Sequence, residues 1–220
     1  MVYLALIGDF IASKDILDRS LVQQKLETCL HSLNHQYQDV LVSKLTITLG
    51  DEFQGLFQLD APIFKLVDEL VLAMKPYKIR FGLGAGEILT PIDPEQSIGA
   101  DGPAYWRARQ AIETVHKKND YGNTQIALIL ENPQLSQQAN ALLAASEHIK
   151  SSWRPSQEEV FEALIELGIY QEQFEQYRVA DYLKLNESAF TKRLKSSGAK
   201  IYFRCRNAVQ ELIARSQEGN

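Results

Sequence analysis

The sequence predicts an open α/β sandwich of the ferredoxin-like type over residues 1–150, followed by a small all-α domain at 151–220. Two observations carry this prediction. Strand-like and helix-like segments alternate along residues 1–150, with two successive strands between the first two helices. A Ser-Ser-Trp-Arg-Pro stretch at 151–155 then marks a linker, and the residues after it fit short helices.

The first half of the predicted sheet starts with a continuous apolar run, Tyr3–Ile7, which is typical of a central strand buried on both faces. A helix over 18–37 follows, with leucines at helical spacing. Strands are predicted over 41–49 and 52–58, where β-branched residues alternate with polar ones. Gly50 between them allows a tight turn, so the two strands form a hairpin.

The second half contains a helix near 61–74, which begins beside Pro62, and a strand over 78–88. That strand carries three evenly spaced glycines, Gly82, Gly84 and Gly86. Because glycine weakens a strand, this spacing indicates that another backbone or a ligand approaches closely. The remaining predicted elements are a helix over 104–118, a strand over 124–130 and a helix over 133–150.

Composition restricts the class of protein. The chain has 220 residues, of which 45% are hydrophobic and 23% charged, as in ordinary globular proteins. We expect a cytoplasmic protein without a membrane segment, because there is no apolar run of about 18 residues and no basic leader. Two distant cysteines fit this, and the histidines form no metal pattern. A net charge of −5 argues against non-specific nucleic-acid binding by the whole chain.

Two carboxylates are candidate metal ligands. Asp51 stands with Glu52 at the predicted hairpin tip, and Asp9 follows the predicted central strand. Carboxylates on neighbouring strands could clamp Mg²⁺ or Mn²⁺, since these ions take hard oxygen ligands. Two alternatives remain open: Asp51 as a solvated turn residue and Asp9 as the cap of the following helix.

The C-terminal domain is predicted to contain a helix over 157–167 capped by Ser156, and then helices over 174–183 and 187–197. The last two fit a helix-turn-helix, in which Ser188, Thr191, Lys192 and Lys195 face outward toward DNA. We expect residues 177–206 to form the DNA-binding region. Its basic stripe consists of Lys192, Arg193, Lys195, Lys200, Arg204 and Arg206. The alternative is a helical bundle with a solvated face.

These motifs carry a family resemblance. The segments Gly8-Asp9-Phe10-Ile11, Leu49-Gly50-Asp51-Glu52 and Ile79–Glu87 resemble the core of class III nucleotide cyclases and the related GGDEF-type palm domains. The whole pattern, including TLGDEFQGLF and IGADGPAYWRAR, is similar to the SatD family, whose members pair such a region with a C-terminal helix-turn-helix. The resemblance therefore implies a cyclase-like palm domain at 1–150.

The resemblance also implies roles for particular residues. The metal site would comprise Asp9, Asp51 and Phe10, and the backbone of Phe10, Ile11, Ala12 and Ser13 would lie against a triphosphate. Arg109 would be the catalytic arginine that stabilises charge on the transferring phosphoryl group. Cyclases of this type complete their site across a homodimer, so a dimer is implied too.

Three positions depart from the cyclase pattern. Ile47 stands where cyclases place a base-reading polar residue, Tyr105 where an asparagine is expected, and Ile98 near the position of a base-reading acid. An apolar side chain cannot read the same base edge, so the metal pair is retained while base selection is not. These departures fit a site for another nucleotide, a site for another reaction, or a domain that binds a nucleotide without catalysis.

Our interpretation is a regulator that senses a nucleoside triphosphate, or a cyclic or linear nucleotide, with Mg²⁺ and contacts DNA through its second domain. One alternative is a nucleotidyl cyclase or transferase that uses the two aspartates, and another is a protein-interaction module. In the helix that follows Asp101, Arg107 and Arg109 are two residues apart and project to different faces, so at most one enters a given site.

Overall fold

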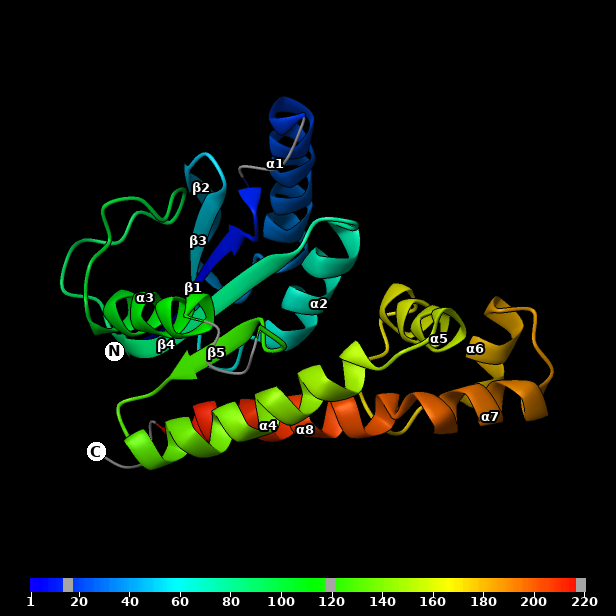
Figure 1. Ribbon diagram of the computed structural model, residues 1–220. Helices are drawn as coiled ribbons and strands as arrows, with labels where there is room; N and C mark the ends of the chain where they lie inside the picture. The colour runs from blue at the N-terminus through cyan, green and yellow to red at the C-terminus, as the bar shows by residue number, and fades with distance from the viewer. Residues whose placement is uncertain (14–17, 118–121, 217–220) are drawn as a thin grey trace.

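The computed structural model describes residues 1–13, 18–117 and 122–216, which contain a five-stranded sheet and eight helices (Figure 1). The sheet order is β2-β3-β1-β4-β5. The strands are β1 (Val2–Phe10), β2 (Leu41–Leu49), β3 (Glu52–Phe57), β4 (Ile79–Glu87) and β5 (Ile126–Ile129). The helices are α1 (Arg19–Gln36), α2 (Ile63–Ala73), α3 (Pro103–His116), α4 (Pro133–Ser151), α5 (Pro155–Glu166), α6 (Gln176–Tyr182), α7 (Glu187–Ser197) and α8 (Ala199–Arg215).

β1 is the central strand, as its apolar run predicts. It pairs antiparallel with β3 on one side and with β4 on the other, and Leu4 to Ile7 are almost completely buried. β2 and β3 form the predicted hairpin, whose turn holds Gly50 with φ +55. β5 is parallel to β4, because α3 crosses over between them. The predicted α/β fold class is therefore confirmed.

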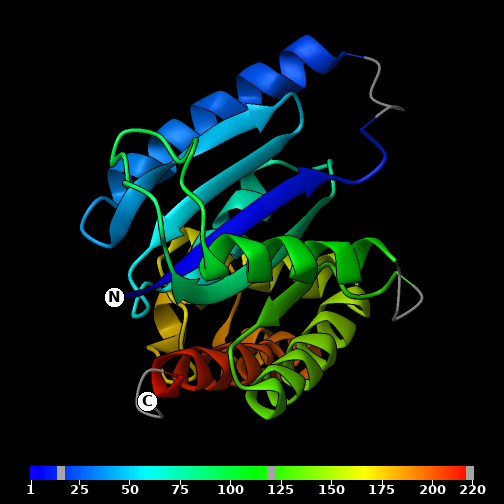
Figure 2. The ribbon, with the colours of Figure 1, turned by 90° about the vertical axis from the view of Figure 1, so that its left-hand side faces the viewer.

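Helices cover the two faces of the sheet unequally (Figure 2). On one face, side chains of α1, α2, α4 and α8 share the main core with Leu4, Leu6 and Phe10 of β1. On the other face, α3 packs over Ala5 and Ile7. This alternation follows from the two-residue period of a strand, and it puts Asp9 on the α3 face.

The three glycines of β4 let the backbone of α3 lie directly on the sheet. A Cβ at Gly82 would stand 2.2 Å from the Ala108 carbonyl oxygen, and one at Gly84 would stand 2.3 Å from both the Ala104 oxygen and the Ala108 nitrogen. At Gly86 the nearest backbone atom would be 2.7 Å away. The close approach that the glycine spacing predicts is therefore made by α3.

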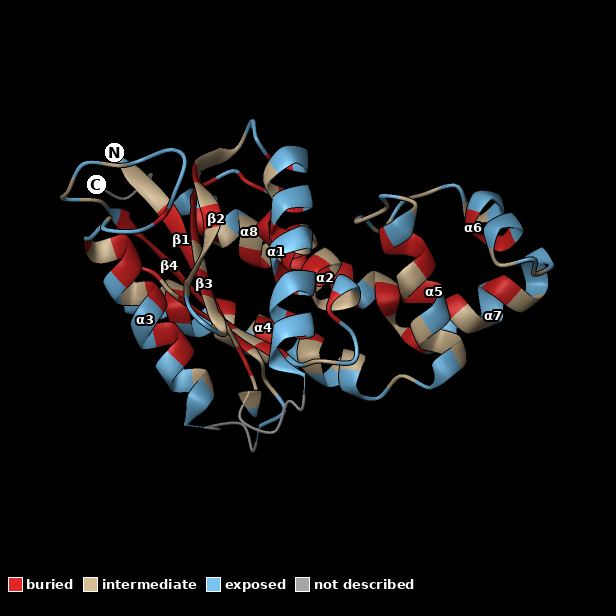
Figure 3. Ribbon diagram, turned by 90° about the horizontal axis from the view of Figure 1, so that it is seen from above, coloured by how far each residue is buried: buried red, intermediate tan, exposed pale blue. Residues whose placement is uncertain are grey.

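The C-terminal helices form a second apolar cluster beside the α/β layer (Figure 3). It joins α5, α6 and α7 to the first turns of α8, where Tyr202 and Phe203 are buried. The later residues Val209 and Ile213 of α8 belong to the main core instead. α8 thus serves both clusters, and the boundary at residue 150 stays a prediction.

Two details of the helical region differ from the sequence predictions. α5 begins at Pro155, and the Gln157 side chain accepts from the backbone N–H of Arg154, so Arg154 rather than Ser156 occupies the cap position. A helix over 199–215 was not predicted. None of the described helices is both long and apolar enough to cross a membrane.

We predict that Gly84→Ala destabilises the protein by about 3 kcal/mol, the upper end of the range for overpacking, because the added methyl meets helix backbone that cannot rotate away. Gly55→Ala is the matched control: its nearest neighbour is the Leu45 side chain, which can move, so the loss should stay within about 1 kcal/mol. Urea unfolding measures both, and equal losses would contradict the close packing of α3.

Candidate functional site

The strand register assembles a row of charged residues at one end of the sheet. Asp9 is directly opposite Glu52 on β3 and opposite Arg80 on β4. Directly opposed residues point to the same face of a sheet, so the three side chains lie together on the α3 face. The sequence predicts that Asp9 meets Asp51. Glu52 and Arg80 are placed opposite Asp9 by the register of β1 with β3 and with β4.

Arg80 forms an ion pair with Asp9, in which its Nε donates to Oδ1. The Asp9 side chain is one-quarter exposed and Arg80 less so. Burial raises the pKa of Asp9 above its ordinary value, Arg80 opposes this rise, and the charges of Asp51 and Glu52 add to it.

Arg109 reaches the same row from α3. Its two terminal nitrogens donate to the two carboxylate oxygens of Glu52, with Nη2 2.8 Å from Oε1. The hydrogen bonds from Arg109 lower the pKa of Glu52, although burial opposes the change, and Thr48 contributes a further hydrogen bond. Arg107 points elsewhere, since it donates to the Ala85 carbonyl oxygen at 2.6 Å.

Asp51 lies at the hairpin tip and lines a cavity of about 300 Å³. The same cavity is lined by Phe10 and Ser13 from the segment after β1, and by Arg19 at the start of α1. Two residues predicted for the nucleotide site, Phe10 and Ser13, therefore share one cavity with the predicted metal ligand Asp51 and with a cation, whereas Asp9 does not line it. Arg19 is a residue that the sequence analysis missed, because nothing in its spacing links the helix start to the hairpin tip.

The segment after β1 offers only part of its backbone to a ligand. The Ile11 N–H donates to the Lys78 carbonyl oxygen at 2.9 Å, so it is already used. Ala12 has φ +56, a left-handed conformation that a residue with a Cβ adopts at a cost. Strain of this kind is common where backbone is held for binding, which leaves Ala12 and Ser13 as the better candidates for phosphate contacts.

The residues present fit a metal ion that arrives with phosphate. No cluster of three or more His, Cys, Asp or Glu that could hold a metal occurs in residues 1–13, 18–117 and 122–216. Asp9 and Asp51 supply two carboxylates, which is the usual protein share at Mg²⁺ sites completed by water and phosphate oxygens. Arg80 would compete with the ion for one Asp9 oxygen. The donor set fits Mg²⁺ or Mn²⁺ with a nucleotide, and not an all-protein metal site.

The three departing positions lie in different places. Tyr105 is a buried residue of α3, Ile47 is half-buried against the main core on the opposite face of the sheet, and Ile98 is exposed in the loop after β4. Tyr105 and Arg109 line a second cavity of about 520 Å³ together with Gln54 and Trp106. Trp106 is half-exposed there, with its Nε1 bonded to Asp101. An aromatic face and an amide are groups that can stack on and hydrogen-bond a base.

The predicted DNA-contacting residues lie on the outer face of α7. Ser188, Thr191, Lys192 and Lys195 are all exposed, while Phe190 and Leu194 pack inward. The Asn186 side chain caps α7 by accepting from the Ala189 N–H at 2.8 Å. The turn before it passes through Lys184 with φ +53.

The basic stripe is shorter than the sequence indicated. Arg206 is 1% exposed and pairs with Glu147, so it is not a surface residue. Arg204 pairs with Glu172 and Arg193 with Glu159. The chain folds α8 back onto α4, which buries the end of the stripe. Lys192 and Lys195 are exposed on α7 and form no ion pair with another described residue.

The comparisons with known proteins agree with the sequence motifs. The family model described as the SatD family matches residues 3–213. None of the curated proteins matches the chain significantly.

Among solved structures, a bacterial light-regulated adenylyl cyclase has a TM-score of 0.43 and 13% identity over 58% of this chain and 74% of that chain. The guanylyl cyclase Cya2 has a TM-score of 0.40 and 15% identity over 52% and 70%. The catalytic core of a rhodopsin-guanylyl cyclase in complex with ATPalphaS has a TM-score of 0.38 and 17% identity over 51% and 72%. Because these TM-scores are below 0.5, the account of the site rests on the residues themselves.

We predict that Arg109→Gln raises the pKa of Glu52, because it removes the hydrogen bonds that lower this pKa most and leaves burial opposed only by the weaker hydrogen bond from Thr48. In the wild type the lowered pKa stabilises the fold above the unfolded pKa of about 4.3, and this contribution is lost as the pH falls through the folded pKa. Carboxyl ¹³C NMR titration measures the change. Arg107→Gln is the control, and a Glu52 pKa that is equal in all three proteins would contradict the assigned pair.

Proposed function

This chain belongs to the SatD family, and we propose that it binds a nucleoside triphosphate with Mg²⁺ or Mn²⁺ at the charged end of its sheet and acts as a nucleotide-responsive regulator. The observation that carries the proposal is that Asp51 of the hairpin tip shares one cavity with Phe10 and Ser13, which directly follow Asp9 and the end of β1. The charge of Asp51 adds to the rise in the pKa of Asp9, and a divalent cation between the two carboxylates would relieve this repulsion.

The bound metal would neutralise charge on the phosphates, and the chain's own groups would orient them. Asp9 and Asp51 would hold the ion, with Phe10 beside it, and Ala12 and Ser13 would offer backbone to the phosphates. Arg19 would add a positive charge in the cavity that Phe10, Ser13 and Asp51 line. The second cavity, with Trp106 and Gln54, is where we propose that the base lies.

Sensing is favoured over turnover because Arg109, the proposed catalytic arginine, is held by Glu52 in a two-point ion pair. In this state the guanidinium is occupied, and it would have to leave Glu52 to stabilise a transferring phosphoryl group. The alternative is a nucleotidyl cyclase or transferase in which nucleotide binding or a second subunit releases Arg109. Both the sensing proposal and the cyclase or transferase alternative include a homodimer.

We predict that Mg²⁺ or Mn²⁺ together with the preferred nucleoside triphosphate raises the melting temperature. At a ligand concentration a hundred times the Kd, linkage gives about 2.7 kcal/mol, or roughly 5–10 °C for a chain of this size. The metal alone should have little effect, because only two carboxylates face it. Asp51→Asn should remove the shift without loss of fold, since the residue lies at a hairpin tip. Thermal unfolding with each of the four triphosphates measures these effects.

Asp60→Asn provides the control, because Asp60 is an exposed acid outside the site. A shift of equal size in the wild type and in Asp51→Asn would rule out the shared metal site. The same samples can be assayed for pyrophosphate: release by a protein that binds the nucleotide supports the transferase alternative, and binding without release supports sensing.

A DNA contact by α7 is a second function that we propose, on the observation that Ser188, Thr191, Lys192 and Lys195 form one exposed face of a capped helix. These groups can donate to phosphates and base edges. The helical module that contains α7 would then transmit nucleotide binding to DNA. The alternative is that this face contacts another protein.

We predict that Lys192→Ala with Lys195→Ala weakens duplex binding and flattens its dependence on salt, each lost phosphate contact lowering the slope by about 0.9. The free energy of unfolding should change by less than about 0.5 kcal/mol, because both side chains are exposed. Fluorescence anisotropy over a range of salt concentrations measures both quantities.

The control carries the same loss of charge on the α/β part of the molecule, through Lys44→Ala with Lys117→Ala. Equal weakening by the two double variants would mean that only net charge matters. If the wild type binds no duplex at low salt, the module contacts protein instead.

A further inference from the structure

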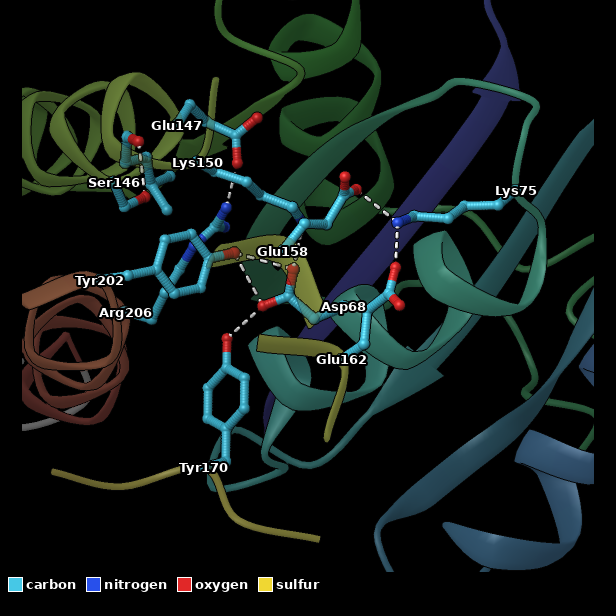
Figure 4. Close-up of polar contacts among 11 residues, drawn as sticks. Asp68, Lys75, Ser146, Glu147, Lys150, Glu158, Glu162, Tyr170, Tyr202 and Arg206 are labelled. Atoms are coloured by element: carbon cyan, nitrogen blue, oxygen red, sulfur yellow. Dashed lines mark hydrogen bonds and ion pairs between the residues drawn. The ribbon is translucent and has the colours of Figure 1, made fainter. Parts of the chain in front are cut away.

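A cavity of about 300 Å³ lies at the seam between the sheet and the helices, on the face of the sheet opposite the charged row of Asp9, Glu52 and Arg80. α2 contributes Asp68 to its wall, and α4 contributes Glu147 and Lys150. Lys78 lies at its β4 side, and Arg206 of α8 completes it. Several of these residues make the polar network that Figure 4 shows. The network joins Asp68 of α2 to residues 147–150 of α4 and 202–206 of α8, so the cavity lies where these three helices meet the sheet.

Arg206 is the unusual member of this wall. It is 1% exposed, and its guanidinium carbon lies 5.0 Å from the ring centre of Tyr202 and 5.4 Å from that of Phe64. Nη2 donates to Glu147. Nε and Nη1 are also buried, yet they find no acceptor within the described parts of the chain. Buried donors of a charged group that lack a partner cost several kcal/mol, so an acceptor that reached Arg206 from the neighbouring cavity would stabilise this side chain.

Asp68 cannot be that acceptor, because its oxygens are already used. It accepts from Lys150 at 2.8 Å, from Tyr170 at 2.6 Å and from Tyr202 at 2.7 Å (Figure 4). Burial opposes ionisation of this carboxyl, but the charges of Lys150 and Arg206 and these hydrogen bonds hold its pKa below the ordinary value. The carboxylate of Asp68 therefore stays ionised, and its oxygens already accept their hydrogen bonds from Lys150, Tyr170 and Tyr202.

The wall also carries an excess of positive charge. Lys78, Lys150 and Arg206 face two carboxylates, Asp68 and Glu147. Lys78 is exposed at the rim and makes no ion pair with a described residue. One unbalanced positive charge on the wall, beside a buried guanidinium with two unpaired donors, is a combination that favours an oxyanion.

We propose that this cavity binds a small molecule bearing a phosphate or carboxylate group, whose oxygens accept from Nε and Nη1 of Arg206 and from Lys78. Because the wall comes from α2, α4, α8 and the sheet, such a ligand ties these elements together. It would bind α8 a few turns from its junction with α7, and so would stiffen the connection to the helical module. The proposal does not depend on the nucleotide site.

The test uses the full chain in metal-free buffer, with inorganic phosphate, malonate and chloride compared at equal ionic strength. We expect phosphate or malonate, but not chloride, to give saturable binding by calorimetry and a matching rise in melting temperature. Lys78→Gln should weaken that binding about tenfold, as expected for loss of one hydrogen bond to a charged group. Since Lys78 is exposed, the variant should fold normally, which Arg206 variants need not do. Saturation by phosphate or by malonate identifies which group is bound.

Two controls make the outcome decisive. Lys192→Gln removes the same charge on α7, and Arg19→Gln removes a cation from the cavity beside Asp51. Both should bind the anion as the wild type does. The proposal is overturned if neither phosphate nor malonate gives saturable binding, if Lys78→Gln leaves the affinity unchanged, or if Arg19→Gln abolishes it.

Discussion

The direct packing of α3 on the glycines of β4 is the constraint on which the charged end of the sheet depends. With no side chains at Gly82, Gly84 and Gly86, the helix lies closer to the strand than any other residue would allow. That position fixes where Arg109 emerges, and only there can both of its terminal nitrogens meet Glu52. The packing of α3 on the glycines of β4 thus determines whether Arg109, the candidate catalytic residue, can pair with Glu52.

A second constraint acts at the opposite side of the sheet, where Asp68 is buried on α2. It is surrounded by hydroxyl groups and cations from later parts of the chain, at Lys150, Tyr170 and Tyr202. Removing one partner of such a network leaves an uncompensated buried charge, so the contacts specify how the helices join the α/β layer. The unpaired donors of Arg206 stand beside this network and give the seam its capacity for an anion.

Much of the sheet could be predicted from the sequence, because its elements have strong periodicity. The apolar run before Asp9, the Gly50 turn and the glycines of β4 each have one physical explanation, and the structure agrees with it. The partners of the charged residues could not be predicted. Arg80 meets Asp9 only through strand register, and Arg206 was interpreted as a surface residue because α8 was not predicted to fold back. Side-chain pairs that depend on long-range register leave no pattern in the local sequence from which they could be predicted.

The central claim is that Asp9 and Asp51 hold one divalent ion with a nucleotide. Amide NMR of the ¹⁵N-labelled protein with a nucleoside triphosphate, first with Mg²⁺ and then with paramagnetic Mn²⁺, tests it most directly. The account predicts that Mn²⁺ broadens the signals of Gly8 to Phe10 and of Gly50 to Glu52 selectively, and leaves those around Arg206 sharp. No selective broadening, or broadening centred on other residues, would contradict it.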